Sequence, residues 1–101
     1  MRYTTFTMGR ASRIDRCAVV STARLTEDDG AHSSALVHRL AALLLHELGH
    51  LLRLQHCGFV CARCRRACAM AFSADARALD HVQAELCQRC RHVLREHLEL
   101  M

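Results

Sequence analysis

The sequence lacks lysine, proline, tryptophan and asparagine, so all 14 of its basic residues are arginine. We regard this bias as compositional and draw no function from it. A long apolar run is also missing, because the longest aliphatic stretch, Leu40 to Leu45, is far shorter than the roughly 20 residues that cross a bilayer. The first fifteen residues contain no apolar core of a secretory signal. We therefore expect an intracellular, cytoplasmic protein with no membrane partner.

Aromatic residues are scarce, at 4% of the chain. None is interleaved with the small basic cluster of Arg63, Arg65 and Arg66, where stacking on nucleic-acid bases would need one. This cluster therefore predicts a solvated loop face, and no nucleic-acid partner is expected. Apolar residues make up 51% of the chain, which excludes intrinsic disorder. With 101 residues and neither repeat nor linker, the sequence predicts one domain, residues 1–101, around a modest core.

The pattern of apolar and turn residues predicts a small, mainly helical α+β fold. Residues 4–11 favour a short extended segment, and the β-branched residues of 17–25 favour a strand. Leucines cover most of the circumference of residues 35–54, which predicts a largely buried central helix capped by Ser33 or Ser34.

The C-terminal part divides into an irregular stretch and a helix. Residues 55–72 have no periodicity and are rich in Cys, Gly and Arg, which predicts a loop held by something other than apolar packing. Ser73 then caps a last predicted helix. Its apolar stripe, at steps of three and four residues, consists of Leu79, Val82, Leu86, Cys90 and Val93.

Seven cysteines and eight histidines are unusual in so short a chain. An odd number of cysteines without an export signal disfavours disulfides and indicates thiols or metal ligands. Six of the seven lie between Cys57 and Cys90, so we interpret them together.

The sequence HELGH at residues 46–50 places His46 and His50 on one face of the predicted helix, where both can reach one ion. Glu47 is positioned to accept a proton from a metal-bound water. His56 could return from the loop as a third ligand. Three neutral nitrogen ligands leave one tetrahedral position open, as in a catalytic zinc site. The alternative is that these are incidental polar residues on a helix.

The motif HELGHLLRLQHC, followed by CAM and then CQRC, resembles the archaemetzincins. These are zinc metallopeptidases with the pattern HExxHxxGxxHC, then Cys-x-Met, then CxxC. The similarity begins at GRAS and CAVVSTARL upstream and covers residues 6–94, which correspond to about the second half of a family member. The strands and first helix that precede this part in the family have no counterpart here, so the resemblance implies a truncated metzincin-like domain with a small residual sheet.

The resemblance implies that His46, His50 and His56 bind a catalytic zinc and that Glu47 is the general base. Met70 would be the Met-turn residue, a thioether beneath the metal that does not coordinate it. An ordinary core methionine is the alternative for Met70.

The resemblance also implies a second, structural zinc. Its four thiolate ligands would be Cys57, Cys68, Cys87 and Cys90. The spacing between the first two is longer than in the family, and the added residues contain Cys61 and Cys64. By spacing alone, this additional CxxC could replace Cys57 and Cys68 in a ribbon-like site. Both ligand sets remain open at this point.

Arg53 departs from the family pattern, which has glycine three residues after the second histidine. The chain must reverse there to return His56 to the metal. A left-handed conformation at a residue other than glycine costs on the order of 1–2 kcal/mol, which bound zinc could offset. If the helix instead continued past Arg53, His56 would be carried away from the metal.

Two functions follow from these ligand sets. The first is a zinc-dependent peptidase with two zinc ions, acting on a peptide or protein substrate through a zinc-activated water and Glu47. The alternative is a non-enzymatic zinc-binding structural or interaction module, in which only the cysteine site functions and the histidines are vestigial.

Overall fold

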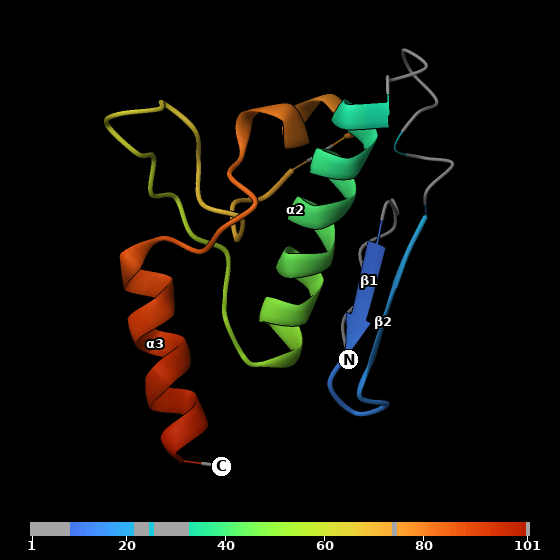
Figure 1. Cartoon of the computed structure of the whole chain (residues 1–101). Helices are drawn as coiled ribbons and strands as arrows, with labels where there is room; N and C mark the ends of the chain where they lie inside the picture. Colours follow the sequence, from blue (N-terminus) through green and yellow to red (C-terminus); the bar gives the residue numbers. More distant parts are fainter. Residues whose placement is uncertain (1–8, 22–24, 26–32, 74, 101) are drawn as a thin grey trace.

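A single long helix, α2, is the centre of the fold. The computed structural model describes residues 9–21, 25, 33–73 and 75–100. In chain order, the elements are β1 (Gly9–Ser12), β2 (Cys17–Val20), α2 (Ser33–Leu51), the 3-10 helix η1 (Arg77–His81) and α3 (Gln88–Glu99). Figure 1 shows α2 between the two strands on one side and α3 on the other. The predicted combination of a small sheet, a central helix and a C-terminal helix is confirmed.

The two strands form an antiparallel hairpin in which Gly9 pairs with Val20 and Ser12 pairs with Cys17. The turn between them is closed by Asp15, whose backbone N–H donates to Ser12 Oγ at 3.1 Å. The strand predicted over residues 17–25 is wrong in its length, because β2 ends at Val20. Within the extended segment predicted at 4–11, residues 4–8 lie outside the described part of the chain.

Helix α2 packs against the hairpin and η1. Its inner face joins a core cluster of Leu25, Ala42, Leu43, Leu79 and Val82. The predicted helix is confirmed, but it begins at Ser33 and ends at Leu51 instead of spanning 35–54. In the described part of the chain, neither α2 nor any other helix is long and apolar enough to cross a membrane.

One charged side chain, Arg39, lies inside this core, with only 2% of its surface exposed. Its guanidinium donates to both carboxylate oxygens of Asp80 at 2.8 Å and to the carbonyl of Leu25. A buried charge is tolerated only when it is paired and hydrogen-bonded, and a two-pronged Arg–carboxylate pair meets that need. Arg39 therefore fastens α2 to η1 and to the chain at Leu25.

The C-terminal region is not the continuous helix predicted after Ser73. The chain forms η1, then passes Ala67 in an extended conformation before α3 begins at Gln88. Ala67 donates to the carbonyl of His81 at 2.9 Å and accepts from the N–H of Gln83 at 2.8 Å. The backbone groups of His81 and Gln83 therefore bond to Ala67, so they cannot form the hydrogen bonds of a continuous helix. Most of the predicted stripe is nevertheless buried: Leu79, Val82, Leu86 and Cys90.

Residues 55–72 form an irregular loop, as predicted. Its two arms are joined by hydrogen bonds from Cys57 N–H to Met70 O and from Cys68 N–H to Phe59 O, both 3.0 Å long. A bridge between Val60 and Ala67 continues this pairing. The loop is therefore a hairpin that has Cys57 and Cys68 in its two arms and the intervening residues at its tip.

Candidate metal centres

Three histidines meet where α2 ends. His46 and His50 lie one turn apart on the helix, and His56 returns from the loop. The ring centroids are 4.5 Å apart for His46 and His50, 5.2 Å for His46 and His56, and 5.0 Å for His50 and His56. One ring nitrogen from each lies within 4.8 Å of the others. The structure therefore brings together the three histidines that the sequence singled out.

A sharp reversal after α2 makes this meeting possible. The N–H of Leu54 donates to the carbonyl of Gly49 at 2.8 Å, and the N–H of Arg53 donates to that of His50 at 3.0 Å. Arg53 has φ 71°, in the left-handed region. Together these features form a Schellman motif, which commonly ends helices and favours glycine at the position of Arg53. The left-handed conformation that the family resemblance implied at Arg53 is confirmed.

The hydrogen bonds of His46 and His50 fix which ring nitrogens can bind a cation. His46 Nδ1 lies 2.8 Å from the carbonyl of Ala69, and His50 Nδ1 lies 2.9 Å from that of Leu54. A carbonyl only accepts, so both Nδ1 atoms carry hydrogen and each neutral ring presents its Nε2 lone pair. The two Nε2 atoms are 3.0 Å apart. Two acceptors cannot hydrogen-bond to each other, but a cation can join them.

The chemistry of this donor set fits zinc. Nitrogen ligands of a tetrahedral zinc, at bond lengths of about 2.0–2.1 Å, lie about 3.3 Å apart, close to the separation of the His46 and His50 Nε2 atoms. Burial, together with the nearby His50 and His56, lowers the pKa of His46 to about 4. Burial also lowers the pKa of His56. The imidazoles of His46 and His56 are therefore neutral near pH 7, which is the form that binds metals.

Glu47 lies next to His46 on α2 and faces β1. Only 7% of its surface is exposed, and burial raises its pKa to about 7. Gly9 leaves room for the carboxylate, because a Cβ atom at Gly9 would lie 2.8 Å from Glu47 Oε2. Strand β1 therefore covers one side of Glu47, and a side chain at position 9 would displace the carboxylate.

Met70 is fully buried beneath the last turns of α2. Its Cε would lie 2.9 Å from a Cβ atom at Gly49, the residue immediately before His50. Its backbone carbonyl accepts from Cys57 N–H. The thioether thus packs against the helix at the level of the histidines, where the family resemblance implied a Met-turn residue.

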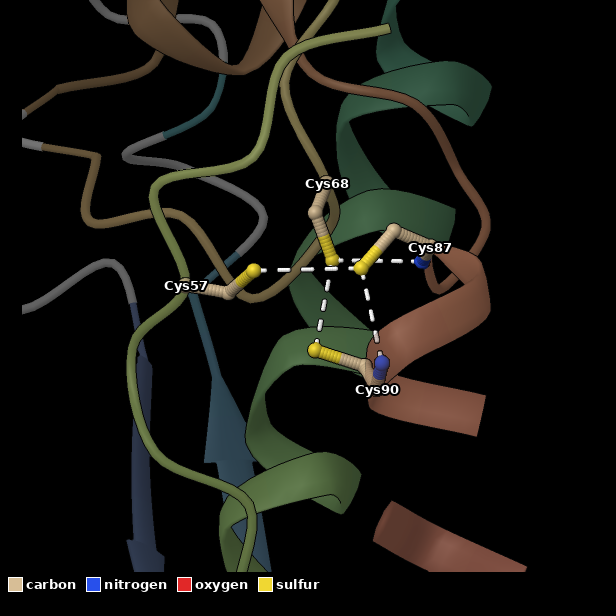
Figure 2. Close-up of side chains that lie close together, drawn as sticks. All are labelled: Cys57, Cys68, Cys87 and Cys90. Carbon is tan, nitrogen blue, oxygen red and sulfur yellow. Dashed lines mark hydrogen bonds between the residues drawn. The ribbon is translucent and has the colours of Figure 1, made fainter. Parts of the chain in front are cut away.

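Four cysteines, two from the loop and two from the start of α3, form a second cluster. Figure 2 shows their side chains converging: Cys57, Cys68, Cys87 and Cys90. The Sγ atoms of Cys57 and Cys87 are 3.8 Å apart, and those of Cys68 and Cys90 are 3.7 Å apart. Both distances far exceed the roughly 2.05 Å of a disulfide. They match the edge of a tetrahedron around zinc, about 3.8 Å for Zn–S bonds of about 2.3 Å.

Backbone N–H groups point at these sulfurs. Cys68 Sγ accepts from Met70 at 3.4 Å and from Cys87 at 3.3 Å, and Cys87 Sγ accepts from Cys90 at 3.4 Å (Figure 2 shows the bonds among the cysteines). Such donors stabilise thiolates. Burial nevertheless raises the pKa of Cys68 and Cys90, because negative charge is unfavourable among crowded, desolvated sulfurs. A cation at the centre would remove that penalty.

Cys61 and Cys64 lie outside this cluster. They are at the tip of the loop hairpin, where Gln83 Nε2 donates to Cys64 Sγ at 2.9 Å. Of the two ligand sets that spacing left open, the structure assembles the one containing Cys57 and Cys68.

Several groups that support the site were not identified from the sequence. Arg39 was not singled out, although a charged residue in a mainly apolar helix is a signal that a buried partner exists. The carbonyls of Ala69 and Leu54, which orient the histidines, leave no mark in the sequence because every residue has one. The ring of Phe72 lies 5.7 Å from that of His56.

A glutamate beside two histidines one helical turn apart, with a third histidine brought back by a reversal, is the arrangement of the metallopeptidase class. A family model, peptidase family M54, matches residues 2–96, and the chain belongs to this family. It is 35% identical over 94 residues to the archaemetzincin of Methanopyrus kandleri, covering 93% of this chain and 49% of that protein. The resemblance to archaemetzincins is confirmed.

Solved structures agree. The crystal structure of archaemetzincin from Methanopyrus kandleri superposes with a TM-score of 0.70 at 33% identity, covering 93% of this chain and 47% of that one. The zinc-dependent peptidase from Methanocorpusculum labreanum also gives a TM-score of 0.70 at 33% identity, covering 88% and 45%. The chain therefore spans about half the length of the curated relatives it matches.

Proposed function

We propose that this chain is a zinc-dependent peptidase in which His46, His50 and His56 hold the catalytic zinc. The observation that carries the proposal is the pair of Nε2 atoms 3.0 Å apart, on rings whose Nδ1 atoms are each hydrogen-bonded to a backbone carbonyl. A carbonyl that accepts from the other ring nitrogen fixes the tautomer of a metal-binding histidine. Zinc bound there supplies polarisation of the scissile carbonyl and lowers the pKa of a water to about 7.

The protein's own contribution to the reaction centres on Glu47. We assign it as the general base that takes a proton from the attacking water and delivers it to the leaving amine. Its partial burial between α2 and β1 holds the carboxylate in one place and keeps bulk water from competing for it. A peptide or protein is the substrate class that family membership supports.

The four-cysteine cluster holds a second, structural zinc in this proposal. Four thiolates complete a tetrahedron and leave no position for substrate. Because two of them come from the loop and two from the start of α3, the ion would join the loop to that helix. The completeness of this cluster also favours the second candidate function, a zinc-binding structural or interaction module with a vestigial histidine site.

The number of zinc ions provides the first test. We expect two per chain by elemental analysis of the purified protein. A variant with His46 and His50 changed to Ala should keep one ion, and a variant with Cys87 and Cys90 changed to Ser should keep the other. A single zinc that is unaffected by the histidine changes would contradict the peptidase proposal.

Peptide hydrolysis separates the two candidate functions. Glu47→Gln should lower turnover of a fluorogenic peptide library by at least about 100-fold, the usual loss when a general base is removed, while both zinc ions stay bound. Glu99→Gln, at the exposed end of α3, is the matched control and should hydrolyse normally. Absence of turnover in the parent chain loaded with two zinc ions would favour the binding module.

A further inference from the structure

The tip of the loop hairpin carries two thiols that neither ligand set uses. We call residues 61–64 the tip turn. Its backbone is fixed by a hydrogen bond from Cys61 N–H to Arg66 O and another from Arg65 N–H to Cys61 O, both 2.9 Å long. In Figure 1, this part of the chain is the yellow excursion that projects away from α2 and α3. The thiols of Cys61 and Cys64 are thus held by a defined turn at the molecular surface.

Hydrogen-bond donors surround both sulfurs. The backbone N–H groups of Cys64 and Arg63, the thiol of Cys64 and the charge of Arg63 all lower the pKa of Cys61. Gln83 Nε2 donates to Cys64 Sγ at 2.9 Å. Donors and positive charge stabilise a thiolate, and the thiolate is the nucleophile in exchange with disulfides. The Cys64 thiol is exposed and that of Cys61 is partly exposed, so both can meet a reagent from solution.

The other described cysteines do not form an exposed pair of neighbouring thiols in a turn, as Cys61 and Cys64 do. The thiols of the buried cluster face one another, and Cys17 is exposed at the start of β2, outside the loop. Among the described residues, no third His, Cys, Asp or Glu joins Cys61 and Cys64 to form a metal-binding group. Two thiols are too few to enclose a four-coordinate ion, so a reaction between the two thiols themselves is favoured.

We propose that Cys61 and Cys64 are a reactive dithiol that exchanges with a small anionic disulfide, such as glutathione disulfide. The Cys61 thiolate attacks one sulfur of that disulfide, whose S–S bond breaks and releases one glutathione thiolate. Cys64, as its thiolate, then attacks Cys61 Sγ in the mixed disulfide and releases the second glutathione thiolate. The two released thiolates take up the two protons lost by the cysteines, so one disulfide is reduced and one is formed.

The charge of the tip turn specifies the class of reagent. Arg63, Arg65 and Arg66 lie in or beside it, and their side chains are exposed. Glutathione disulfide carries a net negative charge, so the local positive potential raises its concentration near the thiols and its rate of encounter. A neutral disulfide of similar size lacks this attraction and should react more slowly.

The test uses the full chain loaded with zinc. It is incubated with glutathione disulfide near pH 7, quenched with acid, alkylated with N-ethylmaleimide and digested with trypsin. Because trypsin cleaves after Arg63, a bond between Cys61 and Cys64 would hold together two peptides that otherwise separate. Cys57 lies in the same peptide as Cys61, so fragmentation of the linked pair must show N-ethylmaleimide on Cys57. We expect this linked pair as the main product, while the thiols of the buried cluster carry N-ethylmaleimide and no glutathione, and Cys17 gains one glutathione.

Single substitutions separate the attacking thiol from the resolving thiol. Cys64→Ser should stop at a mixed disulfide between Cys61 and glutathione. Cys61→Ser should leave Cys64 reacting at least about tenfold more slowly than Cys61 does, because the attacking thiolate is lost. A product that joins other cysteines, or a rate at Cys61 no higher than at Cys17, would overturn the proposal. A loss of zinc on changing Cys61 and Cys64 together would also overturn it, since the pair would then be a metal ligand.

Discussion

Replacing Arg53 by glycine tests the strain stored in the turn that ends α2. Arg53 occupies the left-handed position of the Schellman motif, with φ 71°. That conformation costs a residue with a side chain on the order of 1–2 kcal/mol. Glycine removes this cost but gives the unfolded chain about 0.5–1 kcal/mol more conformational entropy to lose. Arg53→Gly should therefore stabilise the fold by about 0.5–1 kcal/mol, which for a domain of this size raises Tm by roughly 2–8 °C.

The same substitution should affect the histidine site, because the turn positions His56. If the turn relaxes when the metal is absent, zinc must restore the strained conformation each time it binds. Glycine at position 53 removes that cost, so zinc should bind up to about fivefold more tightly for 1 kcal/mol of strain removed. Arg16→Gly is the matched control: Arg16 has φ 55° in the hairpin between β1 and β2, outside the turn that returns His56. It should raise Tm by a similar amount and leave zinc affinity unchanged.

Thermal unfolding and competition with a zinc indicator measure these two effects. The reasoning is refuted if Arg53→Gly lowers Tm or weakens zinc binding while Arg16→Gly stabilises the fold. That result would mean that α2 continues past Arg53 in solution. His56 would then be carried around the helix, and the site would hold only two histidines.

Two other pairs of substitutions probe the loop and the helix. Cys57→Ser should destabilise the loop and release zinc to a weaker chelator, because metal binding and folding are linked there, whereas Cys61→Ser should change stability by no more than about 0.5 kcal/mol. Equal effects on Tm and chelator sensitivity would contradict this ligand assignment. Gly49→Ala should destabilise the fold by about 1–2 kcal/mol, because its Cβ would overlap the buried Met70 side chain and outweigh the helix preference of alanine. Gly58→Ala, with nothing within 4 Å of the added Cβ, should leave Tm nearly unchanged.

The parts of the site predicted well from the sequence depend on local geometry. A helix repeats every 3.6 residues, so the four-residue spacing of His46 and His50 was enough to place them on one face. The return of His56 was different, because a reversal at Arg53 and a continued helix were both compatible with the sequence. The structure selects the reversal through two backbone hydrogen bonds that involve Gly49, His50, Arg53 and Leu54.

The cysteines show why spacing alone was insufficient. By spacing, the pair Cys61 and Cys64 could bind zinc with the CxxC of α3 as well as the wider pair, Cys57 and Cys68, could. The decisive feature is that the loop doubles back on itself, joining Cys57 to Met70 and Phe59 to Cys68 by backbone hydrogen bonds. This pairing places the wider pair together beside α3 and the inner pair at the tip. Pairing between distant backbone groups carries no side-chain signature.

The predicted last helix failed for a related reason. Its apolar stripe is real, because Leu79, Val82 and Leu86 are all buried. A mixture of a 3-10 helix and extended chain can, however, bury residues at the same steps of three and four. The backbone of Ala67 bonds to His81 and Gln83 and thereby interrupts the helix. The buried positions were therefore predicted correctly, but the conformation that joins them was not.

The histidine set and the cysteine set are joined by a single peptide bond, since His56 and Cys57 are neighbours in the chain. A second pair of neighbouring residues also links the two sets. Cys68 belongs to the cysteine set, and the carbonyl of Ala69 bonds to His46 of the histidine set. In the proposed arrangement, an ion bound in either set would restrict the backbone that the other set needs, so we expect the two ions to bind cooperatively. Thermodynamic linkage makes such cooperativity reciprocal. We therefore expect that removing the ion from the cysteines weakens zinc binding at the histidines by the same factor as removing the ion from the histidines weakens it at the cysteines.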